Sequence, residues 1–252
     1  MFDVIITGGT VVDGTGAPGY QADVGISHEK VDAIGDLSRS GARRVINAAG
    51  QAVSPGFIDS HVHSEGALLV NPQHSSGLRQ GITTEILGQD GLSYAPLSAE
   101  NYRIYSRYLS GILGKPPEDL DMSSVEAFRS HYHQKTAVNT AYLVPHGPIR
   151  LEMVGFRDVP LVGDTLEGAR RLVKEGIEQG AVGFSTGLSY HPHAWSDTSE
   201  LVSLCEAAHE AGGVYVTHIR DVNTDRALGG GGVAEALEIG RRSGVRVHFS
   251  HH

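Results

Sequence analysis

The sequence predicts an α/β fold in which a small β domain precedes a parallel sheet covered by helices. Up to residue 55, short apolar runs separated by turn residues indicate a small sheet or β-sandwich. After Pro55-Gly56, near-continuous apolar runs alternate with amphipathic segments, a pattern typical of parallel strands and their covering helices. We therefore divide the 252 residues into a β domain, residues 1–55, and a second domain, residues 56–252.

The β domain is expected to consist of short strands joined by tight turns. The apolar runs 3–7 and 10–13 flank Gly8-Gly9 in the manner of a hairpin. Runs 22–26 and 30–34 flank a second turn, and two shorter runs, 45–47 and 51–53, follow. No helical pattern follows Gly8-Gly9, so a nucleotide-binding loop is a weak interpretation of this pair.

The second domain contains six apolar runs that we expect to form parallel strands. They are Gly56–Asp59, Thr83–Leu87, Thr140–Val144, Ala181–Phe184, Val214–Thr217 and Val245–Phe249. An open α/β sheet and a (β/α)8 barrel of the TIM type both fit this alternation. Because a closed barrel needs eight strands, the barrel interpretation implies that the chain stops two strands short.

Several helices between these strands are marked by capping patterns and by terminal glycines. Ser123 with Glu126, Asp164 with Glu167 and Asp197 with Glu200 have the spacing of a capping box. Gly180, Gly212 and Gly244 are expected to end three helices. The first of these patterns predicts a helix over residues 124–135. Residues 102–115 carry no pattern that assigns them to an element.

Composition excludes several classes of protein. The net charge is −9 and no Lys/Arg block is present, which argues against a nucleic-acid binder. A single cysteine cannot form an internal disulfide. No apolar run is long enough to span a bilayer, and residues 1–10 lack the features of a signal peptide. We expect a cytoplasmic protein that acts on a small molecule and contacts neither membrane nor nucleic acid.

Histidines at strand ends are the candidate functional residues. His61 and His63 follow the first parallel strand, and residues i and i+2 of an extended segment face the same side, so both imidazoles can reach one metal ion. His218 and His251 end the fifth and sixth strands, at the edge where α/β proteins place their active sites. Asp90, after the second strand, can bridge two metals. The alternatives are surface histidines, core histidines and an Asp90-Gly91 turn.

The remaining histidines are weaker candidates. His146 ends the third strand and can contact metal or substrate. His131 and His133 fall on the expected helix 124–135, where i and i+2 point apart, so they cannot share a metal. His191 and His193 flank Pro192 in an expected loop at the mouth of a pocket.

Asp59 lies close enough to His61 and His63 in sequence to act as an oxygen ligand or to support a ligand.

Imidazole and carboxylate ligands suit zinc or another late first-row divalent ion. A metal with an open position activates water and polarises a carbonyl, which is the chemistry of amide or ester hydrolysis. Such hydrolysis also requires a general base that accepts a proton and later returns it to the leaving nitrogen. No Ser/His/Asp triad or nucleophile elbow is visible as an alternative.

Several segments resemble one family of metal-dependent hydrolases. Val53–His63, after Ala48-Ala49-Gly50, resembles the entry segment of the amidohydrolase superfamily, which joins a composite β domain to the first barrel strand. Further similarity lies in residues 88–96, 180–190, 217–220 and 249–251. Together these segments, spread over essentially the whole chain, resemble the N-acyl-D-amino-acid deacylase (D-aminoacylase) family.

The resemblance implies a zinc-dependent enzyme, with one or two Zn²⁺ ions, that splits N-acyl-D-amino acids into a carboxylate and a free D-amino acid. It implies His61 and His63 at one metal position and His218 and His251 at the other. Asp90 stands where better-known members carry a metal-binding cysteine, and His252 stands where a lysine is expected. The implied substrate-binding candidates are Tyr190 and Arg220, together with His146.

One part of the family pattern has no counterpart. The catalytic aspartate of the family lies on the eighth barrel strand, so the general base is expected beyond residue 252 and the catalytic residue is unknown. The chain is then the amino-terminal part of a deacylase, a gene fragment, or half of a split enzyme with a C-terminal complement. Two alternatives remain: a dihydroorotase- or hydantoinase-like cyclic-amide hydrolase, which usually has a lysine on a middle strand, and a non-catalytic metal-binding fragment. Ala181–Phe184 contains no lysine.

Overall fold

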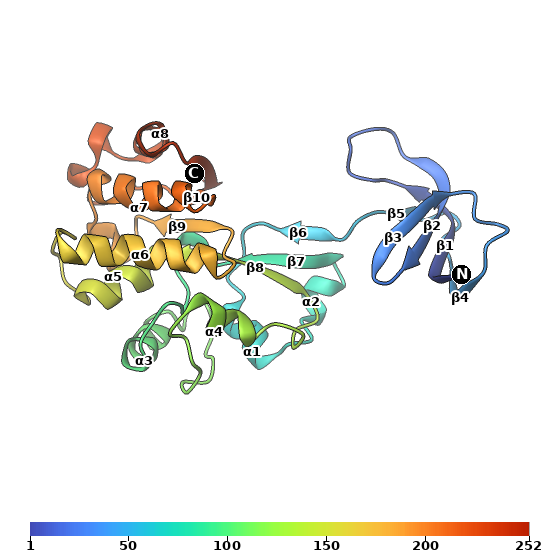
Figure 1. The fold of residues 1–252 in the computed structure, drawn as a ribbon, viewed down its shortest axis with the longest axis horizontal. Helices are drawn as coiled ribbons and strands as arrows, with labels where there is room; N and C mark the ends of the chain where they lie inside the picture. The colour runs from blue at the N-terminus through green and yellow to red at the C-terminus, as the bar shows by residue number, and fades with distance from the viewer. Residues whose placement is uncertain (252) are drawn as a thin grey trace. The chain divides into compact units, whose positions relative to one another are not determined.

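A computed structural model describes residues 1–251 and divides the chain into two compact units. The first is Met1–Phe57 and the second begins at Ile58 (Figure 1). His252, where a lysine is expected from the family pattern, lies outside the described residues. Within residues 1–251, no helix has both the length and the apolar character needed to cross a membrane.

The first unit is a five-stranded sheet in the order β3-β2-β1-β4, with β5 also paired to β1. Its strands are β1 (Phe2–Val11), β2 (Tyr20–Ser27), β3 (Lys30–Gly35), β4 (Ala42–Asn47) and β5 (Ala52–Val53). Strands β1, β2 and β3 pair antiparallel in succession, whereas β4 and β5 run parallel to β1. The predicted hairpin between residues 22–26 and 30–34 is confirmed, and its turn residues His28 and Glu29 have positive φ.

The predicted hairpin at Gly8-Gly9 is wrong, because β1 continues through both glycines with a shift of register between Ile6 and Gly9. A Cβ atom at Gly9 would lie 2.5 Å from Val53 Cγ2 and 3.2 Å from Ala48 Cβ. The glycine therefore serves the close approach of the following chain to β1 rather than a reversal of direction.

The second unit contains a six-stranded sheet whose order, β11-β10-β9-β8-β7-β6, is the order of the chain (Figure 1). The strands are β6 (Phe57–Asp59), β7 (Ile82–Leu87), β8 (Asn139–Pro145), β9 (Gly183–Gly187), β10 (Val214–His218) and β11 (Arg246–His251). All six predicted strands are confirmed, and the pairs from β7 to β11 are parallel. A doubly wound sheet reverses its strand order; this sheet does not, so its winding is that of a curled part of a (β/α)8 barrel.

Within residues 1–251, eight α-helices and four 3₁₀ turns connect these strands. They are α1 (Glu65–Val70), α2 (Ser75–Leu78), α3 (Ala99–Tyr108), α4 (Val125–Ser130), α5 (His146–Val154), α6 (Asp164–Glu178), α7 (Thr198–Glu210), α8 (Gly232–Ser243), η1 (Gln89–Gly91), η2 (His193–Trp195), η3 (Thr224–Arg226) and η4 (Leu228–Gly230). Helices α6, α7 and α8 lie side by side along the sheet (Figure 1). Leu201, Leu204 and Cys205 of α7 are fully buried with Phe184 and Tyr215 of the strands, and this apolar contact holds the layers together.

The capping predictions are partly confirmed. Asp197 caps α7 and accepts a hydrogen bond from Glu200 N at 2.8 Å. Helix α4, however, is capped by Ser124 rather than Ser123, and it ends at Ser130. The prediction of a helix to residue 135 is therefore wrong, since His131 is the C-cap residue and His133 lies in the turn that follows.

Two further predictions about helices need correction. Asp164 is the first residue of α6, not its cap; Gly163 occupies the cap position without a side-chain hydrogen bond. Part of the unassigned stretch 102–115 is helix α3, which Ser98 caps. This helix buries Tyr102 and Tyr105 rather than aliphatic side chains.

Candidate metal centre

The strand-end residues of the second unit meet at one edge of its sheet. His61 and His63 follow β6, Asp90 lies in η1 directly after β7, and His218 and His251 are the last residues of β10 and β11. Parallel strands direct their carboxyl ends to the same edge. Residues separated by up to 190 positions in sequence are therefore brought to a common rim.

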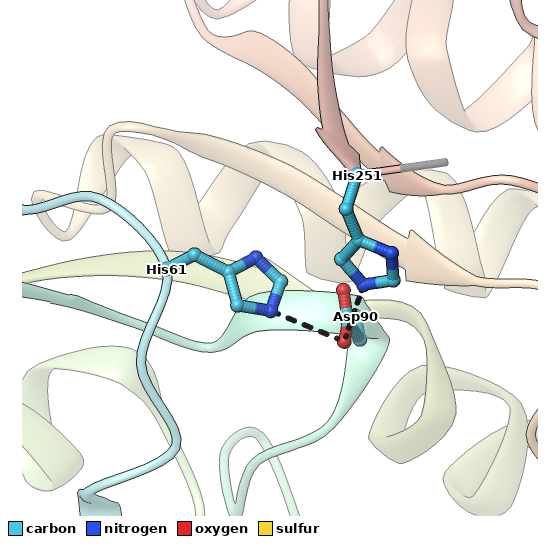
Figure 2. A group of neighbouring side chains, drawn as sticks. All are labelled: His61, Asp90 and His251. Atoms are coloured by element: carbon cyan, nitrogen blue, oxygen red, sulfur yellow. Dashed lines mark ion pairs between the residues drawn. The ribbon is translucent and has the colours of Figure 1, made fainter.

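Four imidazoles converge on one carboxylate oxygen, Oδ2 of Asp90. The distances from this oxygen are 3.4 Å to His61 Nε2, 3.3 Å to His63 Nε2, 3.8 Å to His218 Nδ1 and 3.8 Å to His251 Nε2. Figure 2 shows His61 and His251 approaching Asp90 from different segments, and ligand atoms of these three residues lie within 4.8 Å of one another. His218 Nδ1 is also 3.1 Å from His251 Nε2.

The electrostatics of the rim keep Asp90 ionised. Burial by itself raises the pKa of this carboxyl, but hydrogen bonds from His61 and His63 outweigh burial and hold its pKa well below the usual range. Burial lowers the pKa of His63, yet the hydrogen bond to Asp90 and the charges of Glu65 and Asp90 leave it raised. For His218, burial is the largest effect and its pKa is lowered. The rim thus presents an anionic oxygen among imidazoles of different basicity.

Asp90 adopts an unusual backbone conformation that its surroundings impose. Its φ is +56°, a left-handed value that costs a non-glycine residue free energy. Gly88 N donates to Glu65 Oε1 at 2.7 Å, and His193 Nε2 donates to the Asp90 carbonyl oxygen at 3.1 Å. Ser185 Oγ donates to the Gly88 carbonyl and accepts from Gly91 N at 3.1 Å. These buried partners fix the turn that carries the carboxylate.

The segment that carries His61 and His63 is held separately. Ser64 Oγ donates to Glu85 on β7, and Gln89 Nε2 donates to the Ser60 carbonyl at 2.8 Å. Asp59, considered from the sequence as a ligand or a support for one, accepts a hydrogen bond from His61 N at 3.2 Å. In the structure its carboxylate therefore orients the backbone of the histidine segment.

The three substrate-binding candidates have different surroundings. Tyr190 lies at the rim, with its ring centroid 5.3 Å from that of His218. Arg220 is buried and forms a bidentate pair with Glu235, at 2.8 and 3.2 Å. His146 is buried and lies 2.9 Å from Glu200 through Nε2. Arg220 and His146 are thus engaged inside the protein, whereas Tyr190 is partly exposed beside His218.

Three residues support the site in ways that the sequence does not predict. The sequence predicts His193 at the mouth of a pocket, yet it is fully buried and bonded to the Asp90 carbonyl. Glu65 continues the spacing of His61 and His63, which is a signal that could have identified it. Ser185 carries no such signal, because its two contacts lie 94 and 97 residues away in sequence.

The donor set fits a divalent transition metal. Imidazole nitrogens and a carboxylate oxygen are ligands of zinc and related ions. Asp90 Oδ1, His61 Nδ1 and His63 Nδ1 are buried and find no hydrogen-bond partner among residues 1–251. Four imidazole nitrogens lie 3.3–3.8 Å from Asp90 Oδ2, which is too far for short hydrogen bonds to this oxygen. A bound ion would give these nitrogens a common partner.

Comparison with known proteins finds similar sequences. Residues 44–153 match the Amidohydrolase family. D-aminoacylase of Alcaligenes xylosoxydans xylosoxydans is 33% identical over 100% of this chain and 50% of its own, and N-acyl-D-glutamate deacylase of the same organism is 37% identical over 99% and 50%.

A solved structure gives the same match. N-acyl-D-glutamate deacylase of Bordetella bronchiseptica, complexed with zinc and a phosphonate mimic of the tetrahedral intermediate, superposes with a TM-score of 0.86. It is 33% identical, and the match covers 98% of this chain and 50% of the other. The chain spans about half the length of the known relatives that it matches.

Proposed function

This chain is related over its whole length to the D-aminoacylases and N-acyl-D-amino-acid deacylases of the amidohydrolase family, and we propose that it carries the metal centre of such an enzyme. The reaction is hydrolysis of the amide bond of an N-acyl-D-amino acid to a carboxylate and a free D-amino acid. The observation that supports the proposal most directly is the convergence of His61, His63, His218 and His251 on Asp90.

These five residues are the proposed ligands of one or two Zn²⁺ ions. A bound Zn²⁺ supplies a Lewis acid that activates water and polarises the substrate carbonyl. Asp90 contributes an ionised oxygen central to the four imidazoles, so it is the residue we propose to share between two ion positions. Aspartate is a harder ligand than the cysteine that the family pattern places here, which favours harder ions.

For the substrate, we propose Tyr190 as the residue that contacts it first, because the Tyr190 ring lies against His218 at the rim. Arg220 and His146 were inferred from the family resemblance. To touch a substrate they would have to leave Glu235 and Glu200, so we propose that they support the rim from within. The proposed partner is a small molecule. A cytoplasmic location also stays our prediction.

The general base is the missing catalytic group of this proposal. No carboxylate of residues 1–251 other than Asp90 lies within ion-pair distance of the four imidazoles. The edge strands β6 and β11 each have one side unpaired within the described residues. We propose that a complementary segment outside residues 1–251, which pairs with these edges, brings the base to the rim.

The proposal is tested with the 252-residue chain loaded with Zn²⁺. We expect the chain to bind zinc and the His218→Ala variant to lose this binding. Any turnover should favour N-acetyl-D-glutamate or N-acetyl-D-methionine over the L enantiomers and over hydantoin. Turnover of hydantoin alone would support the cyclic-amide alternative, although β9 contains no lysine. Bound zinc without turnover, even after the complementary segment is added, would support a non-catalytic metal-binding role. An ordinary enzymatic rate without that segment would contradict the proposed origin of the general base.

A further inference from the structure

Both ring nitrogens of His218 have close polar neighbours. Its Nδ1 faces the site, 3.8 Å from Asp90 Oδ2 and 3.1 Å from His251 Nε2. On the opposite side of the ring, Nε2 lies 3.2 Å from Ser189 Oγ. Ser189 Oγ is in turn hydrogen-bonded to Asp221 Oδ1. His218, Ser189 and Asp221 therefore form a continuous chain of hydrogen bonds, which we call the relay.

The direction of each bond in the relay follows from the inventory of protons. A carboxylate accepts hydrogen bonds and donates none, so the single hydroxyl proton of Ser189 must point to Asp221. Ser189 Oγ can then only accept from His218, which requires a proton on His218 Nε2. Neutral imidazole carries one proton, so Nδ1 is left with a lone pair directed at the site.

From this geometry we propose that Ser189 and Asp221 are positioning residues that fix His218 in its Nε2–H tautomer and present Nδ1 as the ligating atom. The inference rests on the proposed function only for the identity of the cation. A ligating histidine is commonly oriented through its second nitrogen, and loss of that outer partner costs about 10- to 100-fold in metal affinity.

The relay distinguishes His218 from the histidines on the other side of the rim. His61 and His63 turn Nε2 toward Asp90, and their Nδ1 atoms find no partner among residues 1–251. The relay also joins two successive loops, since Ser189 follows β9 and Asp221 follows β10. Leu188 N donates to the His218 carbonyl at 3.2 Å, which holds the Ser189 turn against the end of β10.

Two variants break the relay in different ways. Ser189→Ala removes the acceptor of the His218 proton. Asp221→Asn replaces an obligate acceptor by an amide that can donate to Ser189, so the hydroxyl is free to donate to His218 Nε2 and the tautomer can invert. Ser189→Thr keeps the hydroxyl and should restore the relay. Asp225→Asn removes the same charge from an exposed residue four positions further on, outside the relay, and is the matched control.

The first readout uses the metal-free 252-residue chain. Two-bond ¹H–¹⁵N correlation spectra distinguish the imidazole tautomers, and the signals absent from His218→Gln assign His218. We expect the Nε2–H form in the wild type, Ser189→Thr and Asp225→Asn, and a mixture in Ser189→Ala and Asp221→Asn. The proposal would be overturned if His218 of the wild type carried its proton on Nδ1. It would also be overturned if the spectrum of Asp221→Asn were identical to that of the wild type.

The second readout is the affinity for Zn²⁺, measured by competition with a chromophoric chelator. We expect Ser189→Ala and Asp221→Asn to bind Zn²⁺ about 10- to 100-fold more weakly, and Ser189→Thr and Asp225→Asn to match the wild type. Equal affinities throughout would contradict the positioning role. A wild type that binds no Zn²⁺ but shows the expected tautomers would refute the proposed function and leave the relay intact.

Discussion

The two sides of the rim are held in place by different means. On the β7 side, the turn that carries Asp90 is fixed by several separate hydrogen bonds: Glu65 accepts from Gly88 N, Ser185 accepts from Gly91 N, and His193 donates to the Asp90 carbonyl. On the β10 side, most of the buried contacts of the loop after His218 are made by one side chain, Arg220, which pairs with Glu235. Support is therefore distributed on the first side and concentrated on the second.

On the β10 side, the guanidinium of Arg220 joins three segments of the chain. Besides Glu235 on α8, Arg220 donates to the carbonyls of Ala194 and Ser196 at 3.0 and 2.9 Å. Thr198 Oγ1 donates to the same Glu235 carboxylate at 2.9 Å. The loop 194–196 directly follows His193, so loss of this pair would also loosen the support of Asp90. We therefore expect a single substitution on the β10 side to lower stability more than a single substitution on the β7 side.

The largest effect is expected from Arg220→Met. Breaking a buried ion pair by removing one partner leaves an uncompensated charge, here Glu235, and typically costs about 3–5 kcal/mol of unfolding free energy. Denaturant unfolding measures this loss. Arg171→Met, which removes the exposed pair with Glu175 on α6, is the control and should change stability by less than about 0.5 kcal/mol. Similar losses in both variants would show that the β10 side does not depend on this pair.

Asp90→Ala should have the next largest effect, on metal binding rather than on folding. It removes the oxygen on which four imidazoles converge. Loss of a residue that only orients a metal ligand lowers metal affinity by up to ~100-fold, and we expect the Zn²⁺ affinity of Asp90→Ala to fall by more than this. Asp90→Cys supplies a softer ligand and should retain binding, with preference shifted toward softer ions. Metal competition titrations compare the variants. Retention of wild-type affinity by Asp90→Ala would exclude a shared-ligand role.

A smaller effect is expected on the distributed side. His193→Phe leaves the buried Asp90 carbonyl without its donor, which should cost about 1–3 kcal/mol of unfolding free energy. His193→Gln keeps a donor and should lose less. Glu65 and Ser185 still hold the turn, so Zn²⁺ affinity should fall less than in Asp90→Ala. If His193→Phe proved as damaging as Arg220→Met, the contrast between distributed and concentrated support would be wrong.

The rim could be anticipated from the sequence because its information is local. Each apolar run ends at a residue such as His218 or His251, and parallel strands necessarily share an edge. The strands could be predicted for the same reason, whereas the alternation of strands and helices by itself left an open sheet and a barrel as alternatives, and only the family resemblance indicated the barrel. That these residues bind metal stays a prediction.

The support of the rim could not be anticipated, because its contacts are distant in sequence. Arg220 reaches Ala194 and Ser196, 26 and 24 positions away, and His193 reaches Asp90 over 103 positions. No periodicity encodes such pairs. The Gly8-Gly9 error has the same origin, since the glycine serves the approach of Val53 rather than a turn.

The smallest effect concerns pH and the buried pair of His146 and Glu200 behind the rim. Burial is the main cause that lowers the pKa of His146 below its ordinary 6.5, despite the Glu200 carboxylate. The unfolded chain therefore binds a proton that the folded chain does not. Stability is complete above pH 6.5 and falls as the pH drops from there toward the folded-state pKa, with a slope of at most about 1.4 kcal/mol per pH unit.

His146→Gln keeps a polar side chain at this position but does not titrate. Denaturant midpoints measured between pH 5 and 8 should therefore decline less steeply below pH 6.5 in this variant than in the wild type. The control is His133→Gln, which removes an exposed histidine from the turn after α4, away from the buried pair. Parallel profiles in wild type and His146→Gln would mean that His146 titrates alike in both states.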